Sequence, residues 1–139
     1  MKISLLYVGK ARDAHANAMA AEYVKRSGRY ARCEMREIDP RKFDPWSRHA
    51  SGLKILLAPE GLRVDSPAFA RLIEGAEREA RDLVFIVGGA DGLPDGWRER
   101  ADRLLSLTPL TLPHELARAL LAEQIYRALA TLRGHPYAR

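Results

Sequence analysis

The sequence predicts a three-layer α/β fold with a mostly parallel sheet of five or six strands. Short apolar runs that end at glycine or proline alternate along the chain with longer segments of helical periodicity. The strongest runs are almost entirely apolar, which is typical of parallel strands buried on both faces. The length of 139 residues suits a single domain over residues 1–139.

The N-terminal third is predicted to form a strand, a helix and a second strand. The apolar run at residues 3–8 is ended by a glycine, and residues 33–38 alternate polar and apolar side chains before a proline. Between them, Asp13 is a suitable N-cap for a helix that runs to about Arg26. Residues 41–52 are polar and contain turn residues, so we expect an irregular segment there.

The middle of the chain continues the alternation of strands and helices. Residues 54–58 and 83–87 are nearly all apolar and are predicted to be the third and fourth strands. Between them, Ser66 is expected to cap a helix that runs to about residue 80, with a proline in its first turn. A short helix from Trp97 to Arg103 and a fifth strand at residues 104–107 follow.

The last predicted helix, over about residues 114–132, is apolar on more than one face. Alanines lie between its large apolar residues, which are Leu116, Leu120, Leu121, Ile125 and Leu129. Such a helix needs more cover than a small sheet provides.

Composition and charge narrow the possible functions. The formal net charge is +5, and basic residues outnumber acidic ones within residues 25–48, as suits a polyanion such as RNA. A solvated basic face explains this pattern equally well.

No apolar run approaches the roughly 20 residues that span a membrane, so a cytoplasmic location is expected. The single cysteine, Cys33, cannot form a disulfide within the chain, and no zinc-ligand spacing, nucleophile elbow or phosphate-binding glycine motif is present.

Ligands of open parallel sheets bind beyond the carboxyl ends of the strands, which points here to the residues after Leu57, Val87 and Leu107. Gly88 and its neighbouring glycine allow a backbone to approach a ligand, but a plain tight turn is equally compatible with them. The proline-bounded segment 107–113 is able to hold a flat heterocycle through apolar and main-chain contacts. A buried connector explains that segment at least as well.

Several motifs resemble one known family, the large-subunit ribosomal RNA methyltransferase H group of the SPOUT methyltransferases. The motifs are Phe85-Ile86-Val87-Gly88-Gly89-Ala90-Asp91-Gly92, the run from Leu110 to Arg118, its continuation Glu123-Gln124-Ile125-Tyr126-Arg127-Ala128, the closing Gly134-His135-Pro136-Tyr137, and the opening strand. The resemblance covers nearly the whole chain.

The resemblance implies a C-terminal trefoil knot, a homodimer, and methyl transfer from S-adenosylmethionine to N3 of a pseudouridine in large-subunit (23S-type) rRNA within the ribosome. No metal and no membrane would be involved. The cofactor-binding residues carried over by position are Leu57, Gly88, Leu107, Thr108, Pro109, Leu110, Thr111 and Leu112. A partner subunit would supply the cover that the last helix needs.

The C-terminal tail supplies the candidate catalytic and RNA-binding groups. His135 and Tyr137 are the tail side chains able to assist proton transfer, and Arg133 and Arg139 are expected to contact RNA phosphates. In a dimer, the tail is expected to reach the neighbouring subunit's pocket.

The sequence departs from the family at Ala58, where an aspartate is usual, and at Ala138, where a histidine is common. Its segment between the second and third strands is also shorter.

The alternative functions are a non-catalytic RNA- or ribosome-binding module on the same scaffold and a flavodoxin-like enzyme for a phosphorylated ligand. The intact glycines argue against the first, and the absence of a phosphate-binding nest argues against the second.

Overall fold

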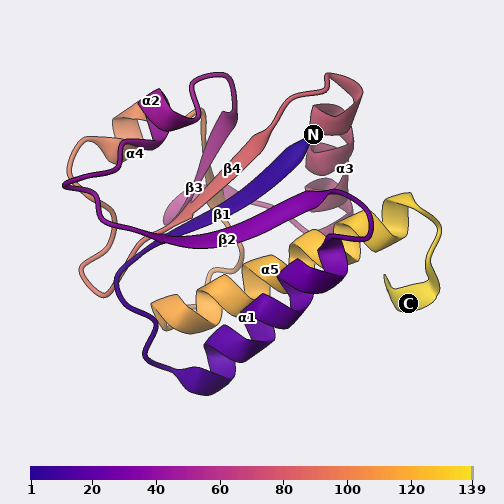
Figure 1. Cartoon of the computed structure of the whole chain (residues 1–139), viewed down its shortest axis with the longest axis horizontal. Coiled ribbons are helices and arrows are strands. Elements are labelled where there is room, and N and C mark those ends of the chain that lie inside the picture. Colours follow the sequence, from indigo (N-terminus) through magenta and orange to yellow (C-terminus); the bar gives the residue numbers. More distant parts are fainter. Residues whose placement is uncertain (139) are drawn as a thin grey trace.

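The computed structural model describes residues 1–138. Strands and short or long helices alternate along the whole chain, as the sequence predicts (Figure 1). In chain order the elements are β1 (Lys2–Val8), α1 (Ala14–Ser27), β2 (Arg32–Ile38), α2 (Pro45–Arg48), β3 (Leu53–Arg63), α3 (Ser66–Arg78), β4 (Leu83–Val87), α4 (Trp97–Arg100), β5 (Arg103–Ser106), α5 (His114–Leu132) and the 3₁₀ turn η1 (Pro136–Ala138).

The five strands form one sheet in the order β2-β1-β4-β3-β5, and every neighbouring pair is parallel. The strand β4 lies at the centre, and all five of its residues are buried. Its uninterrupted apolar sequence is therefore explained by contact with helices on both faces of the sheet. Because all strands are parallel, their carboxyl ends gather at one edge, which is where a ligand site is expected.

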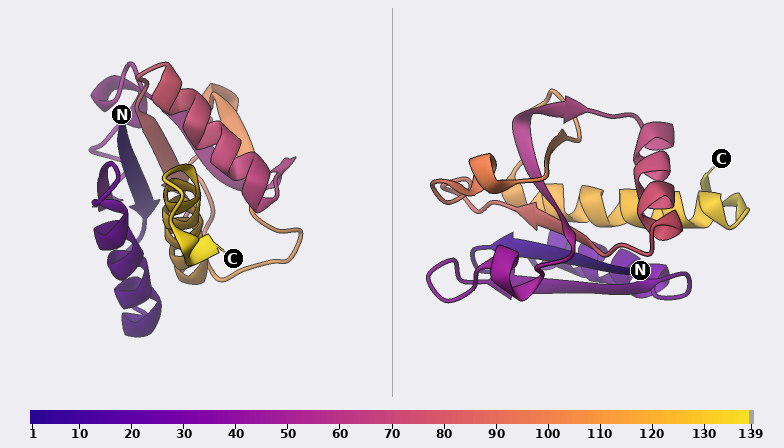
Figure 2. Two further views of the ribbon diagram at one scale, coloured as in Figure 1. Left: turned by 90° about the vertical axis from the view of Figure 1, so that its right-hand side faces the viewer. Right: turned by 90° about the horizontal axis from the view of Figure 1, so that it is seen from above.

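Helices cover the two faces of the sheet unequally. On one face, α5 lies between α1 and α3, as the left view of Figure 2 shows, and packs against both. This face holds the larger core, in which the rings of Phe69 and Phe85 lie 5.7 Å apart. The opposite face is covered by the short helices α2 and α4, where the Trp46 and Trp97 rings meet edge to face at 5.4 Å. The three-layer α/β class is confirmed.

The local signals located most element boundaries correctly. The Asp13 carboxylate accepts the amide N–H groups of His15 and Ala16, so the predicted cap of α1 is confirmed. The cap of α3 is Asp65, whose carboxylate accepts the Ala68 amide at 2.8 Å, and the expectation that Ser66 is the cap was wrong. Ser66 instead donates from its hydroxyl to Gln124 of α5.

Three segments differ from the structure predicted from the sequence, and each of them depends on contacts with distant residues. The region 41–52 contains the short helix α2 rather than only irregular chain, and Phe43 is buried beside it. The strand β3 continues to Arg63, well beyond the predicted end. The helix α4 ends at Arg100, so β5 begins one residue earlier than predicted.

Strand order and register do not define how the chain threads through its own loops, so the trefoil knot stays a prediction. No helix within the described residues is long and apolar enough to cross a membrane.

Candidate functional site

The carboxyl ends of β3, β4 and β5 open onto a cleft of about 270 Å³. Three segments form its walls: residues 57–59, 87–93 and 105–112, with the start of α5 beneath them. The expected cofactor-binding residues that line it are Leu57, Gly88, Leu107, Thr108, Leu110, Thr111 and Leu112. Pro109 does not line the cavity. The structure thus gathers residues from three separate parts of the sequence into one site.

An irregularity in β3 builds the first wall. Leu57 and Leu62 both pair with Leu105 of β5, so the residues between them arch out of the sheet at its carboxyl edge. The return of the strand requires Gly61, because a Cβ there would lie 2.6 Å from the backbone of Leu104. Pro59 and Gly61 are a signal in the sequence from which this bulge could have been found, but the predicted strand ends at residue 58.

The glycine loop after β4 forms the second wall. A Cβ on Gly88 would lie 2.7 Å from the carbonyl carbon of Gly92, so this glycine allows the loop to close on itself. The Gly92 amide completes that closure by donating to the Gly89 carbonyl at 2.9 Å. Because a Cβ on Gly88 would point into the loop, this glycine shapes the wall of the cleft, and its direct contact with a ligand stays a prediction. Gly92 has a φ of +82° and open space where a Cβ would be.

The third wall is the connection from β5 to α5. The Ser106 hydroxyl donates to the Thr108 carbonyl at 3.0 Å, and the Thr108 hydroxyl accepts the Leu110 amide at 3.1 Å. These short-range bonds hold the segment in a compact turn, and leucine side chains line the cleft. Arg98 and His114 are its only ionisable lining groups among the described residues. The cleft is therefore suited to a largely apolar, flat ligand read by main-chain groups.

A buried arginine joins the elements behind the glycine loop. The Arg118 side chain is fully buried, with its guanidinium 4.0 Å from the centre of the Tyr7 ring and donating to the Val8 carbonyl at 3.3 Å. A Cβ on Gly89 would lie 2.8 Å from that same carbonyl oxygen. Burial lowers the pKa of Arg118, and Glu115 at 3.5 Å opposes this shift. Arg118 thereby fixes the end of β1 against the loop that forms the cleft.

Glu115 locks the start of α5 to the start of α1. Its carboxylate accepts the backbone amides of Arg12 and Asp13 and the side-chain amide of Asn17. The two backbone hydrogen bonds are the main reason that the pKa of Glu115 is lowered to about 2. No local pattern in the sequence indicates this contact, because it joins residues about a hundred positions apart.

The structure does not bring the predicted catalytic tail to the cleft of its own chain. The cleft lies at the first turn of α5. The tail follows the last turn of α5 (Figure 1), so the two lie about 28 Å apart along a helix of this length. The Tyr137 hydroxyl donates to Glu123 at 2.7 Å, and its ring packs against Tyr126 at 4.7 Å. Burial and these hydroxyl contacts raise the pKa of Tyr137. The tail is thus docked on the far end of α5.

His135 and the predicted RNA-binding residues lie around the same end. His135 is exposed, and its Nδ1 accepts the Tyr137 amide at 3.2 Å. It lines a hollow with Lys25 and Arg26 from the end of α1 and with Arg29, which follows that helix. Arg133 forms an ion pair with Glu77 of α3 at 3.1 Å. Arg139 lies outside the described residues. The basic segment noted in the sequence therefore meets the tail in space.

Comparison with known proteins identifies the family. A family model described as "Predicted SPOUT methyltransferase" matches residues 1–138. A relative from Solibacter usitatus, named ribosomal RNA large subunit methyltransferase H, is 58% identical over 139 residues that span both chains completely. The chain belongs to the SPOUT methyltransferase family. A relative of the same name from Thermus thermophilus is 40% identical over 140 residues, covering all of this chain and 99% of that one.

Solved structures of proteins described as methyltransferases share the fold at low sequence identity. A probable methyltransferase from Bordetella pertussis matches with a TM-score of 0.64 at 16% identity, covering 92% of this chain and 96% of that one. An AdoMet-bound rRNA methyltransferase from Sinorhizobium meliloti matches with a TM-score of 0.54 at 13% identity, covering 91% and 56%. Within residues 1–138 of this family member, no group of three or more His, Cys, Asp or Glu side chains is placed to hold a metal ion.

Proposed function

We propose that this chain is a single-domain, cytoplasmic enzyme that methylates N3 of a pseudouridine in large-subunit rRNA, in the ribosome, with S-adenosylmethionine as methyl donor. The observation that carries the proposal is the cleft at the carboxyl ends of β3, β4 and β5. It lies in a chain whose full length matches relatives named ribosomal RNA large subunit methyltransferase H.

The residues of the cleft fit the proposed cofactor. Leu57 and Leu107 offer apolar surface for an adenine ring, and the turn at Thr108–Leu112 offers main-chain groups at its edge. Open space beside Gly92, where a Cβ would meet nothing within 4 Å, leaves room for a ligand against the glycine loop. When bound, S-adenosylmethionine supplies an electrophilic methyl group for in-line displacement.

The chain's own contribution is then positioning, exclusion of water and removal of a proton. Alignment of a nucleophile with an electrophile in a desolvated site supplies up to about 7–11 kcal/mol in well-oriented intramolecular models. The N3 proton of the base must leave. Among the described residues that line the cleft there is no carboxylate to take it, since Ala58 stands where the family usually has an aspartate. We assign this task to the tail, with the His135 imidazole as the acceptor. Tyr137, whose raised pKa keeps its phenol protonated, is assigned to stacking on the base.

Because the tail lies at the opposite end of α5 from its own cleft, we propose that it serves the cleft of a second subunit in a homodimer. Four large apolar side chains remain exposed on α1, on the β5–α5 connection and on α5. These are Met19, Leu110, Leu116 and Leu120. Leu121, Ile125 and Leu129 are buried within the chain, so the monomer covers only part of the apolar surface of α5.

Two measurements test the function. Titration calorimetry should show S-adenosylmethionine binding in the micromolar range, roughly −7 to −8 kcal/mol. Mass mapping of rRNA from a strain without the protein should show loss of one N3-methylated pseudouridine, restored by the wild-type gene. A folded protein that binds rRNA but not the cofactor would contradict the enzyme and favour the non-catalytic RNA-binding module.

The tail has its own test. Deletion of residues 135–139 should leave cofactor affinity within about twofold and lower methyl transfer at least a hundredfold, about 2.7 kcal/mol of barrier. The single change H135A separates proton transfer from base stacking, because Tyr137 is retained. Wild-type methylation by the truncated enzyme would show that the tail has no catalytic role.

A further inference from the structure

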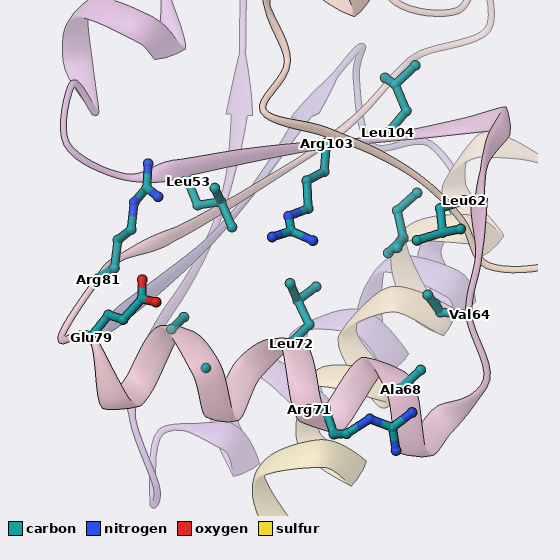
Figure 3. Close-up of a pocket in the computed structure, with 13 residues that line it drawn as sticks. Leu53, Leu62, Val64, Ala68, Arg71, Leu72, Glu79, Arg81, Arg103 and Leu104 are labelled. Carbon is teal, nitrogen blue, oxygen red and sulfur yellow. The ribbon is translucent and has the colours of Figure 1, made fainter.

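A second hollow, of about 580 Å³, lies on the α3 side of the sheet, away from the cleft. It is formed between α3 and the edge where β3 and β5 pair (Figure 3). Its volume falls within the range of roughly 300–1,000 Å³ that is typical of ligand sites. We call it the α3 groove. Nothing in the proposed methyl-transfer mechanism uses it.

The floor of the α3 groove is apolar. It is lined by Leu53, Leu62, Val64, Leu72 and Leu104, and Leu62 is 67% exposed. Gly75 lies on the side of α3 that lines the groove, where a Cβ would meet nothing within 4 Å. A glycine inside a helix costs about 1 kcal/mol relative to alanine. Here that glycine keeps the groove open rather than relieving a close contact.

Arginines surround this apolar floor. Arg71 comes from α3, Arg103 from β5 and Arg81 from the turn before β4, and Figure 3 shows Arg103 extending from β5 toward Leu72. None of the three forms an ion pair within residues 1–138, although eight other basic side chains in that range do. Glu79 is the only acidic residue among the described residues that line the groove. The groove therefore combines an apolar surface with uncompensated positive charge.

We propose that the α3 groove binds an unpaired nucleotide of the RNA substrate, at a point on the RNA remote from the methylated base. The proposal rests on the rRNA substrate proposed above. An RNA base stacks on apolar and guanidinium surfaces, while its phosphate pairs with arginine. A protein segment would match the floor equally well but would leave the three guanidinium groups without anionic partners, so the charge favours RNA.

The groove is placed to act together with the cleft. Leu105 of β5 lines both cavities. Val64 lines both the groove and a smaller hollow that in turn shares Leu107 and Thr108 with the cleft. A single RNA strand is therefore able to follow a continuous surface from the bound nucleotide to the reacting base. Such a contact would fix the register of the RNA and take no part in the chemistry.

The test measures binding of the full-length protein to purified large-subunit rRNA and to ribosomes from a strain lacking the protein, at several salt concentrations. R71A and R103A remove one guanidinium each, and G75W fills the groove. R78A removes an exposed arginine of the same helix that does not line the groove, and G75A adds only a methyl group. Cofactor affinity and oligomeric state are measured on every variant.

We expect R71A, R103A and G75W each to weaken RNA binding by about tenfold, the low end of the loss of one stacked base. The logarithm of the binding constant falls linearly with the logarithm of the salt concentration. R71A and R103A should each make that slope less steep by about 0.7, the value for one phosphate contact on a single strand. R78A and G75A should stay within about twofold, and cofactor affinity should not change.

Unchanged RNA binding by R71A, R103A and G75W, with an active wild type, would overturn the α3 groove proposal and leave the proposed function intact. A wild type that binds rRNA but transfers no methyl group would defeat the proposed function, while the binding measurements would still decide the role of the groove. A wild type without affinity for rRNA contradicts both. If G75W instead changes the oligomeric state, the groove is a subunit contact and the RNA proposal is wrong.

Discussion

Replacing Gly88 by alanine tests whether the loop after β4 builds the cofactor site. The added Cβ would lie 2.7 Å from the carbonyl carbon and 2.9 Å from the carbonyl oxygen of Gly92. Ordinary contact begins at 3.4 Å, so the Gly92 peptide must retreat by about 0.7 Å. All the nearest atoms belong to the backbone, so no side-chain rotation relieves the clash. The loop must open, and with it one wall of the cleft.

The size of the effect follows from this displacement. A misplacement of about 1 Å in a positioned reactant costs on the order of a hundredfold in rate. We therefore expect G88A to lower methyl transfer by about a hundredfold. We expect cofactor affinity to fall at least about tenfold, which corresponds to roughly 1.4 kcal/mol. The overpacking should reduce the free energy of unfolding by about 1–3 kcal/mol. A domain of ordinary stability, about 5–15 kcal/mol, stays folded after such a loss.

Calorimetry with S-adenosylmethionine, a radiolabelled methyl-transfer assay and thermal unfolding measure these three quantities. G75A is the matched control, because the same methyl group enters open space there. It should raise stability by about 0.5–1 kcal/mol and leave cofactor affinity unchanged. A folded G88A variant that binds the cofactor with wild-type affinity would refute the assignment of this loop to the site.

Three further predictions follow from single contacts. The pKa of Glu115 is lowered from 4.5 to about 2, so its stabilising contribution is present above pH 4.5 and is lost as the pH falls toward 2. Urea unfolding should show that the free energy of unfolding of wild type exceeds that of E115Q by less and less as the pH falls through that window. A difference that does not change with pH would contradict the predicted lowering of the Glu115 pKa. Lys54 is 4% exposed, and its ammonium donates to three backbone carbonyls at 2.6–3.1 Å, so K54M should lower the free energy of unfolding by about 3 kcal/mol. An unchanged urea midpoint would show that water replaces those bonds. The change L120K, on the exposed part of α5, should convert a particle of about twice 15.6 kDa into one of 15.6 kDa in light scattering, whereas L62K should not. A dimeric, active L120K protein would place the interface elsewhere.

The sequence by itself determined the elements whose signals are local. The Asp13 cap, the apolar run of β4 and the long apolar pattern of α5 each act within a few residues, and each was located correctly. The alternation of strands and helices then predicted a parallel sheet. A parallel sheet in turn predicted where a ligand site would lie, because all its strand ends meet at one edge. The position of the cleft was therefore accessible before any tertiary contact was known.

Tertiary structure alone decided the features that depend on residues brought together from far apart. The bulge of β3 exists because Leu57 and Leu62 share one partner on β5, and no local pattern specifies that pairing. No local pattern indicates the contacts of Glu115 and Arg118, which are made with the start of α1 and the end of β1. The docking of Tyr137 on Glu123, and its separation from the cleft, follow from the length and direction of α5. Periodicity reports which face of an element is buried, whereas the partner that buries it is decided only by the packing of the whole chain.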